Sequence, residues 1–272
     1  METGHFKNLT GVFLNNTRTI EILNFMIFVS LPTLIIIRER SLHFPYYLLV
    51  LYFCILFVVS KYQKQLIGGR GIHENGMKRF ILNYIVIPLV APIIMKILVG
   101  LFMVVIPIDS NPQGLKEYSL DQLLRSTISN FFSGAEEVWR FATILVVAKI
   151  THLICRQRFA KISLLVGLLV SSLMFGWLHT FPYGGGWFNT DITVALSLMG
   201  LMYGLLLFAT RNLWSVIIAH ILGNMYTSIS LYNSDLGTLI QYSVLGIAMI
   251  FLVYVSAKSN SKGKESSQIE LH

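Results

Sequence analysis

Long apolar runs alternate with short polar segments along this chain of 272 residues. A helix needs about 20 apolar residues to cross the ~30 Å hydrocarbon core of a bilayer. Eight runs approach or exceed this length, at approximately 21–38, 43–60, 80–107, 128–153, 160–179, 191–210, 213–231 and 237–256. The pattern therefore predicts an all-α, polytopic membrane protein built as a bundle of about eight transmembrane helices.

The polar segments between the runs predict how the chain is divided. Residues 1–20 are polar and are predicted to be a cytoplasmic N-terminal segment, and residues 21–125 hold the first three helices with their loops. Residues 126–232 hold four helices that carry unusual polar groups, and residues 233–257 hold the last helix. The tail at 258–272 is rich in serine and lysine, a composition for which we predict disorder.

The overall composition agrees with a membrane protein and excludes one class of partner. The chain is 54% hydrophobic and only 12% charged, whereas a soluble domain carries about 25% charged residues. Its net charge of +8 is expected to place cationic loops beside anionic lipid. Because no basic patch with interleaved aromatic residues lies outside the apolar runs, we expect the lipid bilayer as a partner and no nucleic acid.

Lysine and arginine are distributed unevenly between the two sets of loops. The set that includes the N-terminus, loop 61–79, loop 154–161 and the tail carries fourteen of them, and the other set carries four. Cytoplasmic loops have an excess of these residues. Both termini are therefore predicted to be cytoplasmic, and we expect the protein in a bacterial plasma membrane.

Two carboxylates and an arginine interrupt the apolar run 128–153. Glu136 and Glu137 lie four and three residues before Arg140, so both acids can approach the guanidinium on a helix. Ionisable groups at membrane depth are costly and usually face a protein interior or a wet cavity. The cluster could simply fix helix packing. However, two acids and one arginine leave one carboxylate uncompensated, which suits general acid–base chemistry.

Two later helices contribute histidines at helical spacing to other polar or aromatic residues. Phe175 and His179 are four residues apart in the run 160–179, and His220 and Asn224 are four residues apart in the run 213–231. Each pair therefore shares one helix face. Gly223 permits the close approach of a neighbour. Either histidine taken alone is more often a residue of a helix end or a helix–helix hydrogen bond than a catalytic group.

The predicted orientation allows these groups to converge in one cavity among the helices 128–153, 160–179 and 213–231, in the outer half of the membrane. A carboxylate with a histidine can deprotonate water, and a histidine with an amide can donate to an oxyanion. These are the requirements of amide hydrolysis. Alternatively, Glu136, His179 and His220 could bind zinc, which accepts imidazole and carboxylate ligands. The HExxH spacing is absent, so the sequence leaves both readings open.

The ordered set of motifs resembles a known family. The motifs occur in the order Glu-Glu followed by Arg, then FxxxH, then HxxxN, and the segment Asn212–His220 leads up to the second histidine. Over about residues 130–226 this arrangement is similar to the CPBP family. This family comprises CAAX prenyl endopeptidases and bacteriocin-processing or immunity proteins, and is also called Abi. The resemblance implies an eight-helix intramembrane endopeptidase whose core corresponds to residues 126–232.

The resemblance also implies roles for individual residues. A glutamate of the first motif and His179 would activate water, His220 and Asn224 would form the oxyanion site, and Arg140 and Phe175 would support them. Family members are often named metalloproteases, yet this mechanism needs no metal. We therefore prefer a reading without a cofactor and keep zinc as the alternative.

The first motif departs from the family pattern by one residue. The family usually has EExxxR, whereas this chain has EExxR at Glu136–Arg140. Glu136 is our first choice for the base and Glu137 the second. The expected substrate is a membrane-associated peptide or protein, which fits bacteriocin processing or self-immunity. A prenylated CAAX substrate would need a eukaryotic, cytosol-facing site. The alternatives are a catalytically degenerate scaffold or regulator and a proton-coupled transporter.

Overall fold

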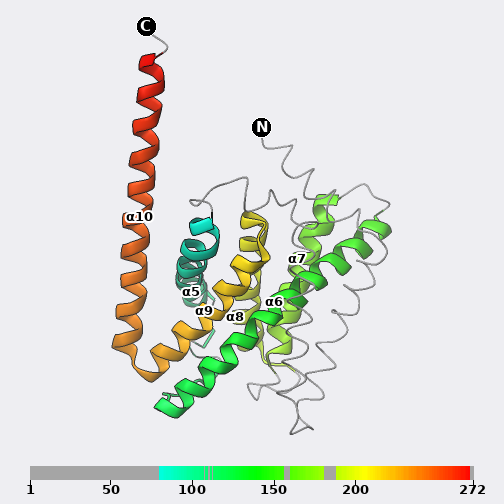
Figure 1. The fold of residues 1–272 in the computed structure, drawn as a ribbon. Helices are drawn as coiled ribbons and strands as arrows, with labels where there is room; N and C mark the ends of the chain where they lie inside the picture. Colours follow the sequence, from blue (N-terminus) through cyan, green and yellow to red (C-terminus); the bar gives the residue numbers. More distant parts are fainter. Residues whose placement is uncertain are drawn as a thin grey trace.

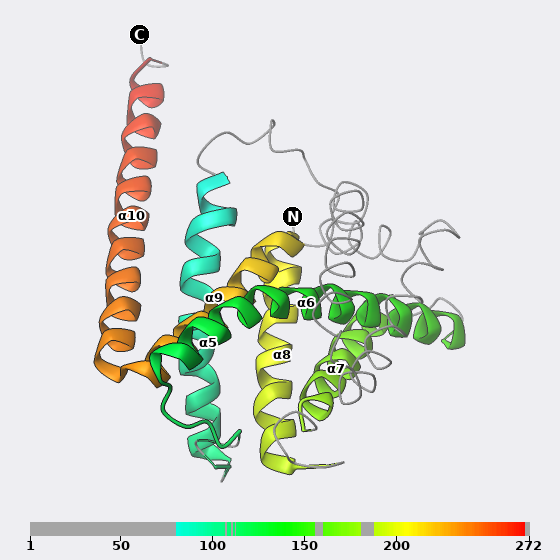
Figure 2. The ribbon, with the colours of Figure 1, turned by 60° about the horizontal axis from the view of Figure 1, so that its bottom comes forward.

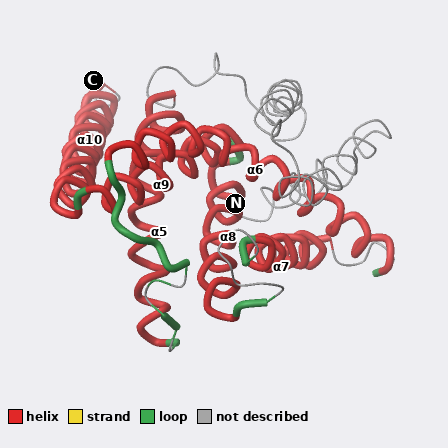
Figure 3. Tube along the Cα trace, turned by 90° about the horizontal axis from the view of Figure 1, so that it is seen from below, coloured by secondary structure: helices red, strands yellow, loops and turns green. Residues whose placement is uncertain are grey.

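The described part of the chain consists of helices and the loops between them (Figures 1 and 3). The computed structural model describes residues 80–106, 108–109, 111, 113–155, 160–180 and 188–269, and these residues contain no strand. The elements are η2 (a π-helical turn, Leu82–Val86), α5 (Ile87–Val105), α6 (Leu120–Ile154), α7 (Ala160–Leu178), α8 (Thr190–Thr210), α9 (Leu213–Tyr232) and α10 (Ser234–Ile269). The predicted segment 1–20 and the predicted helices 21–38 and 43–60 lie outside the described residues.

The other six predicted helices are present. Their observed bounds differ most from the predicted ones at the start of α6 and at the end of α10. α6 begins at Leu120, upstream of the predicted start near 128. The Ser119 side chain accepts from the Gln122 backbone N–H, and the Gln122 side chain accepts from the Ser119 N–H. This capping box satisfies N–H groups that would otherwise lack partners. It allows two polar turns to precede the apolar run.

The tail predicted to be disordered from residue 258 is helical, since α10 continues to Ile269. The physical reason is that extending an existing helix is much easier than nucleating one. The lysine, glutamate and glutamine residues of this stretch are also good helix formers. In Figure 1 this last part of α10 rises beyond the other labelled helices.

Three helices of the described part are long and apolar enough to cross a membrane: Leu82–Val105, Thr190–Thr210 and Ser234–Tyr254. A shorter apolar helix covers Ile162–Leu178. α6 and α9 are not among the three, because they carry charged or polar side chains between their apolar ones. The helical fold and the apolar helices agree with an integral membrane protein.

The core forms where α6 packs on α7 and α9, and where α7 packs on α8. In Figure 2 α6 runs across the long axes of α5 and α8. The helices approach closely at glycines: a Cβ at Gly134 of α6 would lie 2.8 Å from Ile217 Cγ2 of α9, and a Cβ at Gly176 of α7 would overlap the Thr193 carbonyl of α8. These contacts bring the polar residues of α6, α7 and α9 together.

A tight turn between α8 and α9 sets the start of the helix that carries His220. Arg211 adopts the left-handed conformation at φ 53°, which ends α8 sharply. The next residue, Asn212, caps α9 by accepting a hydrogen bond from the Trp214 backbone N–H at 3.1 Å. The turn therefore fixes where α9 begins, and with it the position of His220.

Candidate active site

Polar residues of α6 and α9 meet in two places along their interface. Asn130 Nδ2 donates to Ser228 Oγ at 3.1 Å, and His220 Nδ1 lies 2.7 Å from Glu137 Oε1. Residue numbers rise along α6 as they fall along α9, so the two helices are antiparallel here. The interface places the predicted acids and the second histidine at the same level of the bundle.

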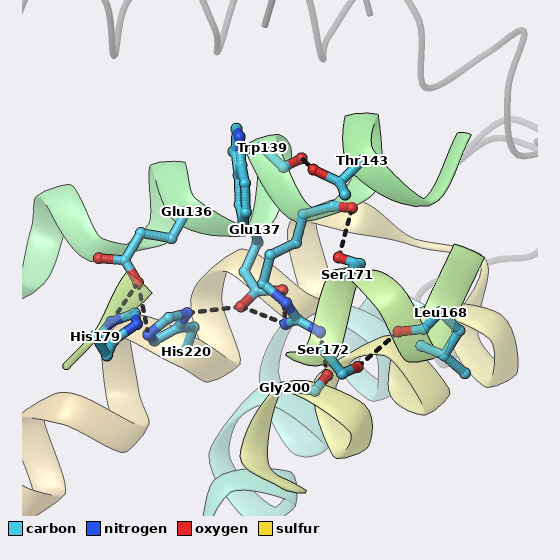
Figure 4. A network of polar contacts seen from close by, with 11 residues as sticks. Glu136, Glu137, Trp139, Thr143, Leu168, Ser171, Ser172, His179, Gly200 and His220 are labelled. Carbon is cyan, nitrogen blue, oxygen red and sulfur yellow. Dashed lines mark hydrogen bonds and ion pairs between the residues drawn. The ribbon is translucent and has the colours of Figure 1, made fainter. Parts of the chain in front are cut away.

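The two adjacent glutamates have different surroundings (Figure 4). Glu137 is 3% exposed and lies between His220 and Arg140, whose Nη1 is 2.9 and 2.7 Å from its two carboxylate oxygens. The side chain of Glu136 is 30% exposed, and its Oε2 lies 3.5 Å from His179 Nε2 and 3.9 Å from His220 Nε2. Successive helix residues differ by about 100° in direction. Glu136 therefore faces both histidines, while Glu137 points into the core.

Arg140 is enclosed by residues of three helices. Its Nη2 donates to the Gly200 carbonyl of α8, and its guanidinium carbon lies 5.0 Å from the centre of the Phe175 ring of α7. A Cβ at Gly204 would overlap a methyl group of Leu168 and would lie 3.6 Å from Arg140 Nη2. A buried charge requires such partners. Arg140 therefore joins Glu137 to α7 and α8.

His179 presents one ring nitrogen to Glu136 because the other is already bound. Its Nδ1 lies 2.7 Å from the Phe175 backbone carbonyl. Since a carbonyl can only accept, Nδ1 carries the hydrogen. In the neutral ring Nε2 is then the basic nitrogen, and it faces Glu136. His179 remains 21% exposed, so this edge of the site is the open one.

The His220 ring is fixed by two aromatic neighbours as well as by Glu137. Phe175 approaches it edge-on with ring centres 6.0 Å apart, and Tyr203 of α8 lies parallel to it at 5.0 Å with an interplanar angle of 14°. Tyr203 was not among the residues predicted from the sequence. A usable signal was present, because Tyr203 lies between Gly200 and Gly204, and small residues four apart indicate close helix packing.

Asn224 is the predicted residue that the structure does not connect to the cluster. It lies on α9 one turn after His220 and is partly buried. No hydrogen bond or ion pair joins its side chain to the other predicted residues of the described chain. The expectation for Gly223 is confirmed, since a Cβ there would lie 2.7 Å from Tyr203 Oη and 3.2 Å from Pro92 Cβ. The neighbours that approach closely are therefore α8 and α5.

The predicted zinc ligands Glu136, His179 and His220 lie near one another. Within the described ranges, no group of three or more His, Cys, Asp or Glu side chains is arranged to hold a metal ion. Oε2 of Glu136 lies near Nε2 of each histidine, at 3.5 Å from His179 and 3.9 Å from His220.

Comparison with known proteins identifies the region that contains this site. Residues 122–226 match the family model described as Type II CAAX prenyl endopeptidase Rce1-like. The resemblance inferred from the motifs is thus confirmed for this part of the chain, which includes α7, α8 and most of α6 and α9. The family is one of proteases. Neither the comparison with curated proteins nor the comparison with solved structures finds a match to the chain.

Proposed function

We propose that this chain is an intramembrane endopeptidase that hydrolyses a peptide bond of a membrane-associated peptide or protein. The observation that carries the proposal is the position of the Glu136 carboxylate, 3.5 Å from His179 Nε2 and 3.9 Å from His220 Nε2. The match of residues 122–226 to a protease family supports the reaction class. Glu136 rather than Glu137 is the proposed base, because Glu137 is held by Arg140 and His220.

Activation of water is assigned to Glu136 and His179. Both side chains are partly exposed, so a water can lie beside the pair and contact both from the exposed side. The water gives a proton to this pair as its oxygen bonds to the carbonyl carbon of the substrate. When the tetrahedral intermediate collapses, the C–N bond breaks and the same proton passes to the departing amine nitrogen. The immediate products are a carboxylic acid and an amine, and the base is regenerated; the acid then loses its proton to water.

Stabilisation of the oxyanion is assigned to His220 and Asn224. His220 donates its Nδ1–H to Glu137, and in the doubly protonated form it also has an Nε2–H to donate. The Asn224 amide supplies a second donor from the next turn of α9. Such donors act strongly in a site that excludes water.

The proposed substrates are membrane-associated peptides, such as precursors, signal-like segments or bacteriocin leaders, and self-immunity to a bacteriocin is a related role. A substrate held in the membrane would reach Glu136 and His179 from the exposed edge of the site. Arg140, Phe175 and the Glu137 carboxylate are proposed to hold the reactive groups rather than to contact the peptide.

The test compares variants in a host that lacks the protein. Wild type, Glu136→Gln, His179→Ala, His220→Ala and Asn224→Ala are expressed, and membrane peptides are followed by mass spectrometry. At least one cleavage product is expected to disappear in each variant at unchanged protein level. Asp121→Asn is the matched control, because this acid lies on the exposed start of the same helix. If all four variants keep every product of the wild type, the chain acts instead as a scaffold or regulator.

The metal-free mechanism has its own test. Purified protein is analysed for bound metals, and cleavage of the identified product is measured before and after chelation. Activity is expected to be unchanged by the chelator. Stoichiometric zinc that is lost in His179→Ala or His220→Ala, together with loss of activity on chelation, would establish the zinc-dependent form.

A further inference from the structure

Tyr203 contacts the one histidine that the candidate site buries most deeply. It is 2% exposed, and its ring lies parallel to the His220 ring at 5.0 Å. His220 is also held by Glu137, which binds Nδ1, and by Phe175, which meets the ring edge-on. The ring turns about its Cα–Cβ and Cβ–Cγ bonds, and a single contact at Nδ1 still allows small tilts about both. The parallel tyrosine face removes this freedom.

The position of Tyr203 depends on a glycine of α9, because a side chain at that place would occupy the space of the tyrosine hydroxyl. Gly223 follows His220 by three residues, and a Cβ there would lie 2.7 Å from Tyr203 Oη. The tyrosine side chain therefore extends along α9 from His220 to the turn that carries Asn224. Any residue larger than glycine at 223 would push the hydroxyl group, and the ring with it, away from this helix.

We infer that Tyr203 is a positioning residue that holds the His220 ring so that Nε2 faces Glu136. The inference rests on the proposed function for its catalytic consequence, but the ring orientation can be measured without activity. Tyr203 does not contact the proposed reacting atoms. It acts through His220, and the face of its ring rather than its hydroxyl is the part that acts. Gly223 is the residue that makes room for it.

The first experiment observes the His220 ring directly. The full chain is labelled with ¹⁵N in its histidine rings, purified in detergent and studied by NMR, and the His220→Ala spectrum assigns the resonances. Wild type and Tyr203→Phe are expected to give the same single set of His220 ring-nitrogen signals. Tyr203→Met fills the space without a flat ring and is expected to shift or split that set. Tyr226→Met is the matched control, since this buried tyrosine of α9 binds the Leu89 carbonyl of α5 instead.

Two results of the NMR experiment would overturn the inference. One is an unchanged His220 signal in Tyr203→Met. The other is an equal change in the Tyr226→Met control, which would show a general loss of packing. Neither result depends on whether the chain cleaves peptides, so a failure of the proposed function is distinguished from a failure of this inference.

The second experiment uses cleavage of the identified peptide. A small misplacement of a reacting group can lower the rate by about a hundredfold. We expect Tyr203→Met to lower kcat by about tenfold to a hundredfold with KM changed by less than about twofold. Tyr203→Phe is expected to keep the wild-type kcat. A change confined to KM would show that Tyr203 contacts substrate, and would refute the positioning role.

A double variant tests the role of Gly223. Gly223→Ala alone is expected to lower kcat, because its new methyl group meets the Tyr203 hydroxyl. Removing that hydroxyl in Gly223→Ala/Tyr203→Phe is expected to restore part of the loss, which is the signature of two coupled positions. If the two substitutions act independently, the geometry argued for Tyr203 and Gly223 is wrong.

Discussion

Replacing Arg140 by methionine is predicted to destabilise the protein strongly. Arg140 is 1% exposed and Glu137 is 3% exposed. The substitution removes the Nη1 contacts to both Glu137 oxygens and leaves that carboxylate buried with His220 alone. Breaking one side of a buried ion pair costs about 3–5 kcal/mol. We expect a loss of that size in the free energy of unfolding.

The same helix provides the control. Arg125 also pairs with an acid on α6, through a contact of 2.8 Å to Asp121, but these side chains are 79% and 68% exposed. Exposed pairs contribute about 0–1 kcal/mol. Arg125→Gln is therefore expected to change stability by less than about 1 kcal/mol. The contrast between the two arginines isolates burial as the cause.

Unfolding can be followed in detergent by tryptophan fluorescence, since Trp139 is buried beside Arg140. Arg140→Lys is expected to recover only part of the loss, because an ammonium group cannot bind Glu137 and the Gly200 carbonyl in the geometry of a guanidinium. The double variant Glu137→Gln/Arg140→Met is expected to lose less stability than the two single variants lose together, because no unpaired charge remains. An Arg140→Met protein as stable as Arg125→Gln would refute this account.

Three further predictions follow from the packing and the site. Glu136→Gln should abolish cleavage and leave stability within about 1 kcal/mol, whereas Glu137→Gln should reduce both; thermal unfolding beside the peptide assay separates them. Gly176→Ala should destabilise by about 1–3 kcal/mol because its methyl group meets the α8 backbone, while Gly246→Ala, with open space around it, should be neutral or stabilise by up to about 1 kcal/mol in the same unfolding assay. Asn212→Ala should cost about 1 kcal/mol by removing the cap of α9, and Asn212→Ser should recover most of it; equal stability of the two variants would contradict the capping role.

The helices of the described part could be read from the sequence because apolar runs and caps are local features. The start of α9 at Leu213 was predicted correctly. The start of α6 was not, because a hydropathy pattern responds to apolar residues and misses the polar turns after Ser119. The opposite error occurred in the tail, where polar composition suggested disorder although the helix continues to Ile269.

The meeting of the two acids, the arginine and the two histidines could also be predicted, but not which partner each acid contacts. Glu136 and Glu137 are adjacent, and the sequence gives no reference for the rotation of α6 about its axis. The choice between them depends on where α7 and α9 pack. Tyr203 was missed for a related reason, since its contact with His220 exists only through the crossing of α8 and α9. Polar groups at comparable depth in the membrane can be predicted to meet. The stacking of two rings, in contrast, is known only once the helices are seen packed together.

Phe175 belongs to both halves of the cluster at once. Its backbone carbonyl holds His179, while its ring lies beneath the Arg140 guanidinium and against the edge of His220. The centre of the same ring lies 4.3 Å from that of His179, so a shift of this one side chain would disturb both the charged pair in the core and the partly exposed histidine. The cluster is therefore one energetic unit, in which losses from separate substitutions will not add. Ranking its residues by single substitutions would count the contribution of Phe175 several times.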